Sequence, residues 1–280
     1  MVEAFIPKSL SECLELLNTH DLKIVAGGTD MLIQNRTHSS LPIGYKGDVL
    51  YISQIEELKN IYEDNQFVYI GAGATLETIM ENLSVSKLLR ETILEMASPA
   101  IRHTATLAGN IANASPAGDS LVSLYLLDAE VELKSLTNTR RMFVKDFIYG
   151  VRKINLEKNE MITKIIIPKL KFSHAYFKKV GPRLSDAISK LSFSGAYLVE
   201  LGRIIDFRVA FGAVNIYVVR SPGLELKIIG KTVSQLKNQV EEILNWYEPL
   251  IKPIDDQRSN KNYRKEVSLN LLREFIESLN

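Results

Sequence analysis

Two glycine-centred segments of this chain carry residue types suited to binding phosphate groups. The first is IVAGGTD at residues 24–30, and the second is TLAGNIANASP at residues 106–116. Each places small residues where we expect an apolar strand to end, so backbone N–H groups can face a ligand with no Cβ in the way. Two such segments in one chain of 280 residues predict a dinucleotide held at two points.

Other common chemistries have little support in the sequence. Cys13 is the only cysteine, so the chain cannot form an internal disulfide or hold an iron–sulfur cluster, which usually takes four ligands. We interpret it as a small buried residue in a helix. The histidines, at positions 20, 38, 103 and 174, lack the spacing of metal ligands, and no Walker motif is present. The sequence predicts neither a metal site nor nucleotide hydrolysis.

A third glycine segment, GAGAT at residues 71–75, resembles the start of a Rossmann fingerprint. Leu76 stands where that fingerprint requires its third small residue, so we interpret the segment as structural. Thr75 is then expected to cap a helix over residues 76–83.

The elements that must position these segments follow from apolar periodicity. In the first part of the chain, strands are predicted at residues 22–26, 48–52, 66–71, 130–134 and 161–167. Helices are predicted over residues 9–18, 76–83, 88–97 and 119–127, and residues 31–33 predict a partly buried turn or helix. The last third predicts strands at 196–200 and 207–211 and amphipathic helices over 234–247 and 263–279.

The composition is that of a globular protein with two domains. Hydrophobic residues make up 46% of the chain, and 34 basic residues balance 33 acidic ones, which argues against nucleic acid as a partner. No apolar run approaches the roughly 18 residues that span a bilayer, so no membrane partner is expected. The first residues lack the features of a signal peptide, and a cytoplasmic location is expected.

These segments and their spacing resemble a known family, the FAD-binding medium subunits of the molybdenum hydroxylases, which include xanthine dehydrogenase and aerobic carbon monoxide dehydrogenase. The family loop AGGTD is at residues 26–30, and its second element stands as IRHTATLAGNI at 101–111, followed by NASP and Asp119. Further matches are KVGPR at 179–183, AIS at 187–189, Phe211-Gly212, and the closing residues Asp256, Arg258, Tyr263 and Arg264. The resemblance covers nearly the whole chain.

Three positions depart from the family pattern. Ala108 replaces the first glycine of a Gly-Gly pair, and a positive φ at this position would strain it. His103 replaces the usual asparagine, and Ser259-Asn260 stand where Gly-Ser is common. None of these changes removes a group that carries chemistry.

The resemblance implies an α+β fold. Residues 1–170 would form a two-part FAD-binding domain of the PCMH, or vanillyl-oxidase-like, type, with subdomains at about 1–55 and 56–170. Residues 171–280 would form a smaller α+β C-terminal domain.

The resemblance also implies the residues that contact FAD. The first segment would wrap the pyrophosphate through Ile24, Val25, Ala26, Gly27, Gly28, Thr29, Asp30 and Met31. The second would add contacts to phosphate or ribitol oxygens through Thr106, Ala108, Gly109 and Asn110. No catalytic residue is implied, and Arg102 is interpreted as ordering its loop.

Five more positions are implied, each with a plainer alternative. Asp119 would accept a hydrogen bond from ribose or adenine, or would cap a helix. Met96, Ile162 and Ile188 would lie near the flavin, or would simply be core residues. Lys179 would place a cation near the flavin, or would be a solvated surface lysine.

The implied function is that of an oxidoreductase flavoprotein subunit. FAD would receive electrons from [2Fe–2S] clusters on a small partner subunit, after substrate oxidation at molybdopterin on a large partner subunit. NAD or another carrier would then accept them. The alternatives are a free-standing flavin oxidase with the same FAD-binding fold and a non-catalytic assembly subunit.

Overall fold

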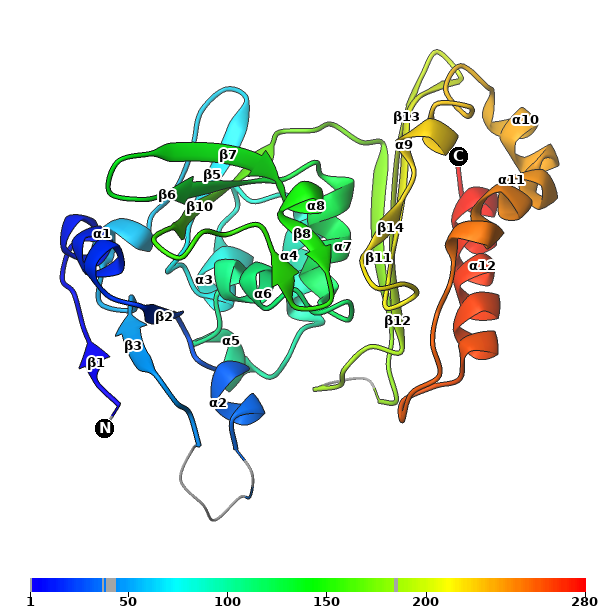
Figure 1. Cartoon of the computed structure of the whole chain (residues 1–280). Helices are drawn as coiled ribbons and strands as arrows, with labels where there is room; N and C mark the ends of the chain where they lie inside the picture. Colours follow the sequence, from blue (N-terminus) through cyan, green and yellow to red (C-terminus); the bar gives the residue numbers. More distant parts are fainter. Residues whose placement is uncertain (1, 37, 39–43, 184–185) are drawn as a thin grey trace. The chain divides into compact units, whose positions relative to one another are not determined.

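The computed structural model describes residues 2–36, 38, 44–183 and 186–280 (Figure 1). The chain forms two compact units and passes between them at five places, after residues 86, 96, 114, 128 and 169. The first unit contains Met1–Ser86, Ala97–Ala114 and Ala129–Lys169, and the second contains Lys87–Met96, Ser115–Asp128 and Leu170–Asn280. Across the described ranges, no helix is both long enough and apolar enough to cross a membrane.

The first unit begins with a parallel sheet of three strands in the order β1-β3-β2. The strands are β1 Ala4–Phe5, β2 Leu22–Val25 and β3 Asp48–Tyr51, and helix α1, Leu10–Thr19, connects β1 to β2. Ser9 caps α1 by accepting a hydrogen bond from the N–H of Glu12 at 3.2 Å. Cys13 is fully buried, and burial raises the pKa of its thiol to about 12. Its interpretation as a small core residue is therefore confirmed.

The second sheet of the first unit is antiparallel, with the order β4-β5-β10-β6-β7. Its strands are β4 Ile61–Glu63, β5 Phe67–Gly71, β10 Met161–Pro168, β6 Glu130–Lys134 and β7 Thr139–Phe143. Strand β10 is rich in apolar residues and occupies the middle of the sheet, where it is buried almost throughout. The remaining elements are η1 Glu56–Leu58, α2 Met31–Gln34, α3 Leu76–Glu81, α5 Pro99–Arg102, α6 Leu107–Asn113, α8 Val144–Phe147 and the hairpin of β8 Ile148–Gly150 and β9 Lys153–Ile154.

The second unit is built on an antiparallel sheet in the order β11-β12-β13-β14. These strands are β11 His174–Val180, β12 Leu191–Glu200, β13 Arg203–Gly212 and β14 Val219–Arg220. Its helices are α4 Lys87–Leu94, α7 Asp119–Leu126, α9 Pro222–Glu225, α10 Val233–Asn238, α11 Val240–Tyr247, η2 Glu248–Leu250 and α12 Lys261–Glu277.

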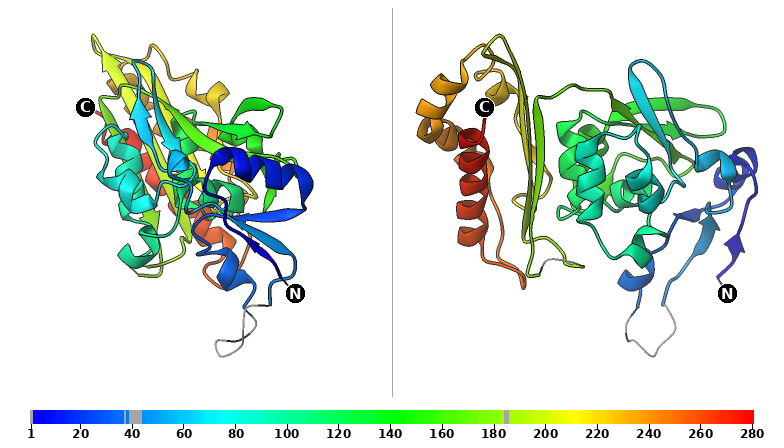
Figure 2. Two further views of the ribbon diagram at one scale, coloured as in Figure 1. Left: turned by 90° about the vertical axis from the view of Figure 1, so that its left-hand side faces the viewer. Right: turned by 180° about the vertical axis from the view of Figure 1, so that it is seen from behind.

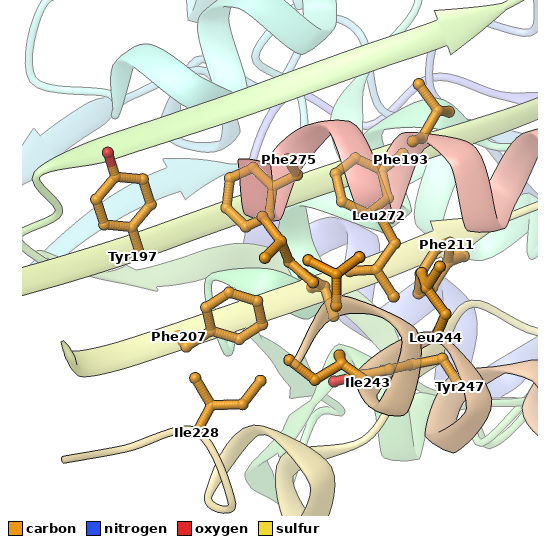
Figure 3. Close-up of a cluster of buried hydrophobic side chains, with 14 of the residues drawn as sticks. Phe193, Tyr197, Phe207, Phe211, Ile228, Ile243, Leu244, Tyr247, Leu272 and Phe275 are labelled. Carbon is orange, nitrogen blue, oxygen red and sulfur yellow. The ribbon is translucent and has the colours of Figure 1, made fainter. Parts of the chain in front are cut away.

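The two faces of this sheet are covered by helices from different parts of the chain. Helices α10, α11 and α12 cover one face (Figure 2). On that face Phe193, Phe207, Phe211 and Phe275 form an aromatic core with Tyr247 (Figure 3). Helix α7 packs against β12 and β13, and α4 packs against β11. Their contacts include the buried hydroxyls of Ser123 and Ser194, 3.1 Å apart.

The structure corrects two sequence predictions about elements. Residues 31–33 do form a helix, but the prediction that they are partly buried is wrong for Ile33, which is 69% exposed. The single helix predicted over residues 234–247 is instead two helices, α10 and α11. Gln239 separates them because its backbone leaves the helical conformation, with φ −107° and ψ 15°.

Candidate cofactor site

The first glycine segment forms the turn between β2 and α2, and its two glycines serve different purposes. A Cβ at Gly27 would lie 2.0 Å from the carbonyl oxygen of Thr104, so only glycine lets this turn approach the second segment. Gly28 has a φ of +67°, which favours glycine, and a Cβ there would meet Val25 and Leu32 at 3.4 Å. Both glycines therefore serve the fold of the turn, and their role in letting the backbone approach a ligand stays a prediction.

Backbone donors in this turn are available to a ligand. Within the described part of the chain, the N–H groups of Gly27, Gly28 and Thr29 donate to no other residue. Unpaired N–H groups in a turn form a concavity that attracts anions. This arrangement agrees with the predicted use of the segment.

The second glycine segment is not the end of a strand, as predicted, but the start of helix α6. Thr106 caps this helix by accepting a hydrogen bond from the N–H of Gly109 at 3.0 Å. Local capping explains the difference, because a threonine before a run of small and apolar residues favours a helix. Ala108 is helical and has no positive φ, so the predicted strain at this position is absent. The Thr106 hydroxyl still has its own proton to donate.

The two segments line one pocket in the first unit, with a volume of about 310 Å³. Its hydroxyl side chains are Ser53, Thr75, Thr78, Thr104 and Thr106. Its small residues are Ala26, Gly27, Gly73 and Ala74, and its basic residues are Lys59 and His103. Among the described residues, no carboxylate lines the pocket. Hydroxyl, amide and cationic donors without acidic groups suit a phosphate-bearing ligand.

The segment interpreted as purely structural, residues 71–75, also contributes to this pocket. Thr75 caps α3 as predicted, by accepting a hydrogen bond from the N–H of Thr78 at 3.2 Å. It also pairs with Thr106 in an isolated β-bridge, and Leu76 N–H donates to Ala105 O at 2.8 Å. These bonds hold the segment beside α6. Gly71 and Gly73 are the sequence signal for the close approach of this segment to neighbouring backbone, which the Rossmann fingerprint does not describe.

Arg102 orders the loop before α6, as interpreted from the sequence. Its side chain is buried and its Nε donates to Glu77 Oε2 at 2.9 Å. This pair joins α5 to α3, on which Thr78 lies.

Of the other predicted contacts in the first unit, none lines the pocket. Ile24 and Val25 belong to β2, and Ile162 is buried in β10. Asp30 and Met31 stand at the start of α2, where the Asp30 carboxylate accepts a hydrogen bond from Gln34. Ala108, Gly109 and Asn110 lie in α6. The pocket therefore contains Ala26, Gly27 and Thr106 of the predicted set.

The second unit brings Asp119 and Lys179 together in a buried ion pair. Lys179 Nζ lies 3.0 Å from Asp119 Oδ2, and their side chains are 7% and 6% exposed. Ser189 Oγ donates to Asp119 Oδ1 at 2.6 Å, and Lys179 Nζ donates to Glu95 O at 2.8 Å. Burial raises the pKa of the Asp119 carboxyl, and Lys179 and Ser189 oppose that rise by stabilising the charged form.

These contacts remove two of the plainer alternatives. Lys179 is not a solvated surface lysine, because its ammonium is buried against Asp119. Asp119 is the first residue of α7 but makes no capping hydrogen bond, since its carboxylate is directed to Lys179 and Ser189.

Met96 and Ile188, the other predicted contacts in the second unit, differ in burial. Met96 is buried, which agrees with a core residue. Ile188 is 59% exposed, so its interpretation as a core residue is wrong. It lies next to Ser189, whose hydroxyl is turned to Asp119.

Two family models match almost the whole chain. A model described as the FAD binding domain in molybdopterin dehydrogenase matches residues 1–170. A model described as the CO dehydrogenase flavoprotein C-terminal domain matches residues 175–279.

Curated relatives and solved structures agree with these matches. The glyceraldehyde dehydrogenase medium chain of Sulfolobus acidocaldarius is 28% identical over 264 residues, 93% of this chain and 92% of the relative. The nicotinate dehydrogenase FAD-subunit of Eubacterium barkeri is 33% identical over 208 residues, 71% of this chain and 69% of the relative. The reconstituted CO dehydrogenase from Oligotropha carboxidovorans contains a chain of the same fold, with a TM-score of 0.88, 22% identity and coverage of 98% and 96%.

Proposed function

Because this chain belongs to the family of FAD-binding medium subunits of molybdopterin-dependent hydroxylases, we propose that it binds one FAD non-covalently. Through this FAD it would pass electrons from a larger complex to an external acceptor. Its partners would be a small subunit with [2Fe–2S] clusters and a large molybdopterin subunit. The relatives are medium chains or FAD-subunits by name, which supports such an assembly.

The observation that carries the proposal is the chemistry of the pocket. Gly27 with its free N–H group, five residues with hydroxyl side chains and a lysine line a space without a carboxylate among the described residues. An anionic diphosphate would accept hydrogen bonds from these donors and be stabilised by the lysine, which would repel a cationic ligand. The pocket lies near the lower end of the usual size of small-molecule sites, so it would hold the diphosphate portion and not the whole cofactor.

When bound, FAD supplies the ability to accept electrons one at a time from iron–sulfur clusters and to release them to NAD or another external carrier. The residues of this chain would bind and orient it. The turn at residues 26–29 and Thr106 would hold the phosphates through N–H and O–H donors. We also propose that Asp119, Lys179, Met96, Ile162 and Ile188 contact the remainder of the cofactor.

The ion pair between Asp119 and Lys179 changes the interactions that these residues would make with the cofactor. Lys179 is neutralised by Asp119, so it would give the flavin a hydrogen-bond donor and little net positive charge. The Asp119 carboxylate would still have lone pairs for a ribose hydroxyl.

The visible spectrum of the purified full-length chain tests the proposal. We expect bands near ~370 and ~450 nm and release of FAD by heat or acid. A colourless chain that also fails to bind added FAD would overturn the proposed function.

Replacing Gly27 by alanine tests the turn specifically. The new Cβ would collide with the Thr104 carbonyl oxygen, so the turn must move away from the second segment. FAD affinity should fall by about tenfold or more, because a hydrogen bond to an anionic group is worth about 1.5–3 kcal/mol. Equilibrium dialysis with FAD measures the effect.

Gly223→Ala is the matched control for this substitution. A Cβ at Gly223 meets no atom within 4 Å, so this variant should bind FAD as the wild type does. Equal affinity of Gly27→Ala and Gly223→Ala would show that the turn does not hold the diphosphate.

A further inference from the structure

The pocket contains a cation that the glycine segments themselves do not supply. Residues 24–31 and 106–110 include no lysine or arginine, and the first contains Asp30. Lys59 is the single lysine or arginine that lines the pocket within the described residues. Neutral donors alone leave the negative charge of a bound diphosphate uncompensated. An adjacent ammonium group compensates for part of this charge.

We propose that Lys59 neutralises the diphosphate of the bound dinucleotide and so sets the affinity of this chain for FAD. The proposal rests on the proposed function and deepens it, since it names the residue whose positive charge binds the diphosphate of the cofactor.

The backbone that carries Lys59 is fixed against the segment at residues 71–75. Gly73 N–H donates to Leu58 O at 2.8 Å, and Gly71 N–H donates to Asn60 O at 2.9 Å. A Cβ at Gly71 would lie 2.1 Å from Leu58 O, so glycine is required for this close approach. These contacts explain the glycines of GAGAT and hold the backbone on either side of Lys59 at the pocket wall.

The present partner of Lys59 is easily exchanged. Lys59 Nζ lies 2.6 Å from Glu56 Oε1, within the same turn of chain. The Glu56 side chain is 82% exposed and that of Lys59 is 40% exposed, so water can replace either partner. Exposed pairs of this kind contribute between zero and about 1 kcal/mol. An incoming diphosphate can therefore take the ammonium from Glu56 at little cost.

The experiment compares FAD and riboflavin, which lacks the diphosphate, by equilibrium dialysis with the full chain. Lys59→Met should weaken FAD binding by about 10- to 100-fold, the value of one charge-assisted hydrogen bond. Riboflavin binding should not change, and Lys59→Arg should retain most of the FAD affinity. Raising the salt concentration should weaken FAD binding more in the wild type than in Lys59→Met.

Glu56→Gln is the control for a structural role of the Glu56–Lys59 pair. If Lys59 acts on the diphosphate, this variant should bind FAD as tightly as the wild type or more tightly. Equal loss in Glu56→Gln and Lys59→Met would overturn the inference, as would an unchanged FAD affinity in Lys59→Met. Failure of the wild type to bind FAD would instead overturn the proposed function itself.

Discussion

Gly27 is required at its position because of a neighbouring backbone segment. The carbonyl oxygen of Thr104 lies where the Cβ of any other residue would be. The sequence identified Gly27 and Thr106 as pocket residues because their local pattern is distinctive. It did not identify Lys59 or Ser53, because their neighbours in the pocket are distant in sequence and no local spacing marks them.

The buried pair of Asp119 and Lys179 makes a prediction at this scale. Lys179→Met leaves the Asp119 carboxylate buried without its counter-ion, and breaking such a pair costs about 3–5 kcal/mol. The free energy of unfolding in urea should fall by that amount. The double variant Asp119→Leu with Lys179→Met should recover much of the loss because no charge is then left buried. A double variant less stable than Lys179→Met would contradict this account.

At the scale of elements, periodicity and caps predicted most of the structure. Strands β3, β5, β6 and β10 were predicted within about two residues because they are apolar runs between turns. Strands β7 and β11 were missed, since both carry charged or polar residues on a half-exposed face, which gives no apolar pattern. The strand predicted before the second segment was wrong because Thr106 caps a helix there.

Edge strand β7 carries an ion pair that links stability to pH. Arg140 Nε and Nη2 each lie 2.8 Å from an oxygen of Glu160, just before β10. This hydrogen bonding from Arg140 holds the pKa of Glu160 below its usual value. A lowered pKa in the folded state contributes stability that is present above the unfolded pKa and is lost as the pH falls through the folded value.

The corresponding prediction concerns Glu160→Gln. At pH 7 the wild type should have the higher melting temperature, and the difference should shrink as the pH falls below about 4. Thermal unfolding monitored by circular dichroism from pH 7 to pH 3 measures it. Glu241→Gln, which breaks an exposed pair with Arg273, should change the melting temperature less. A difference that stays constant with pH would rule out the link.

At the scale of the whole molecule, the compact units do not follow the order of the sequence. Helices α4 and α7 come before residue 170 but belong to the second unit. Arg208 of β13 donates to Leu126 O at 3.0 Å and to Asp128 Oδ2 at 2.7 Å, which secures the end of α7. The sequence could not predict that α4 and α7 belong to the second unit, because no local pattern in α7 indicates the sheet against which it packs. The division predicted at residue 170 stays a prediction about sequence domains.

A fragment of residues 1–170 should therefore fail to fold as an independent domain. It would keep α7 but lose β12 and β13, against which this helix packs. The buried side chains of Leu121, Val122 and Leu124 would then face water. Size-exclusion chromatography and proton NMR should show association and poorly dispersed resonances, unlike the full chain. A monodisperse fragment with well-dispersed resonances would contradict this expectation.

The five crossings of the chain also bear on the order in which the protein is made. The first unit is complete once residue 169 has been synthesised, but α4 and α7 must wait for the strands that follow. The last of these strands, β13, ends at Gly212, so at about 5–20 residues per second the ribosome needs on the order of 2 to 9 s to make them. During this interval α4 and α7 have been synthesised, but the sheet that covers their buried side chains has not. Binding by chaperones would be concentrated on these helices while the chain is nascent.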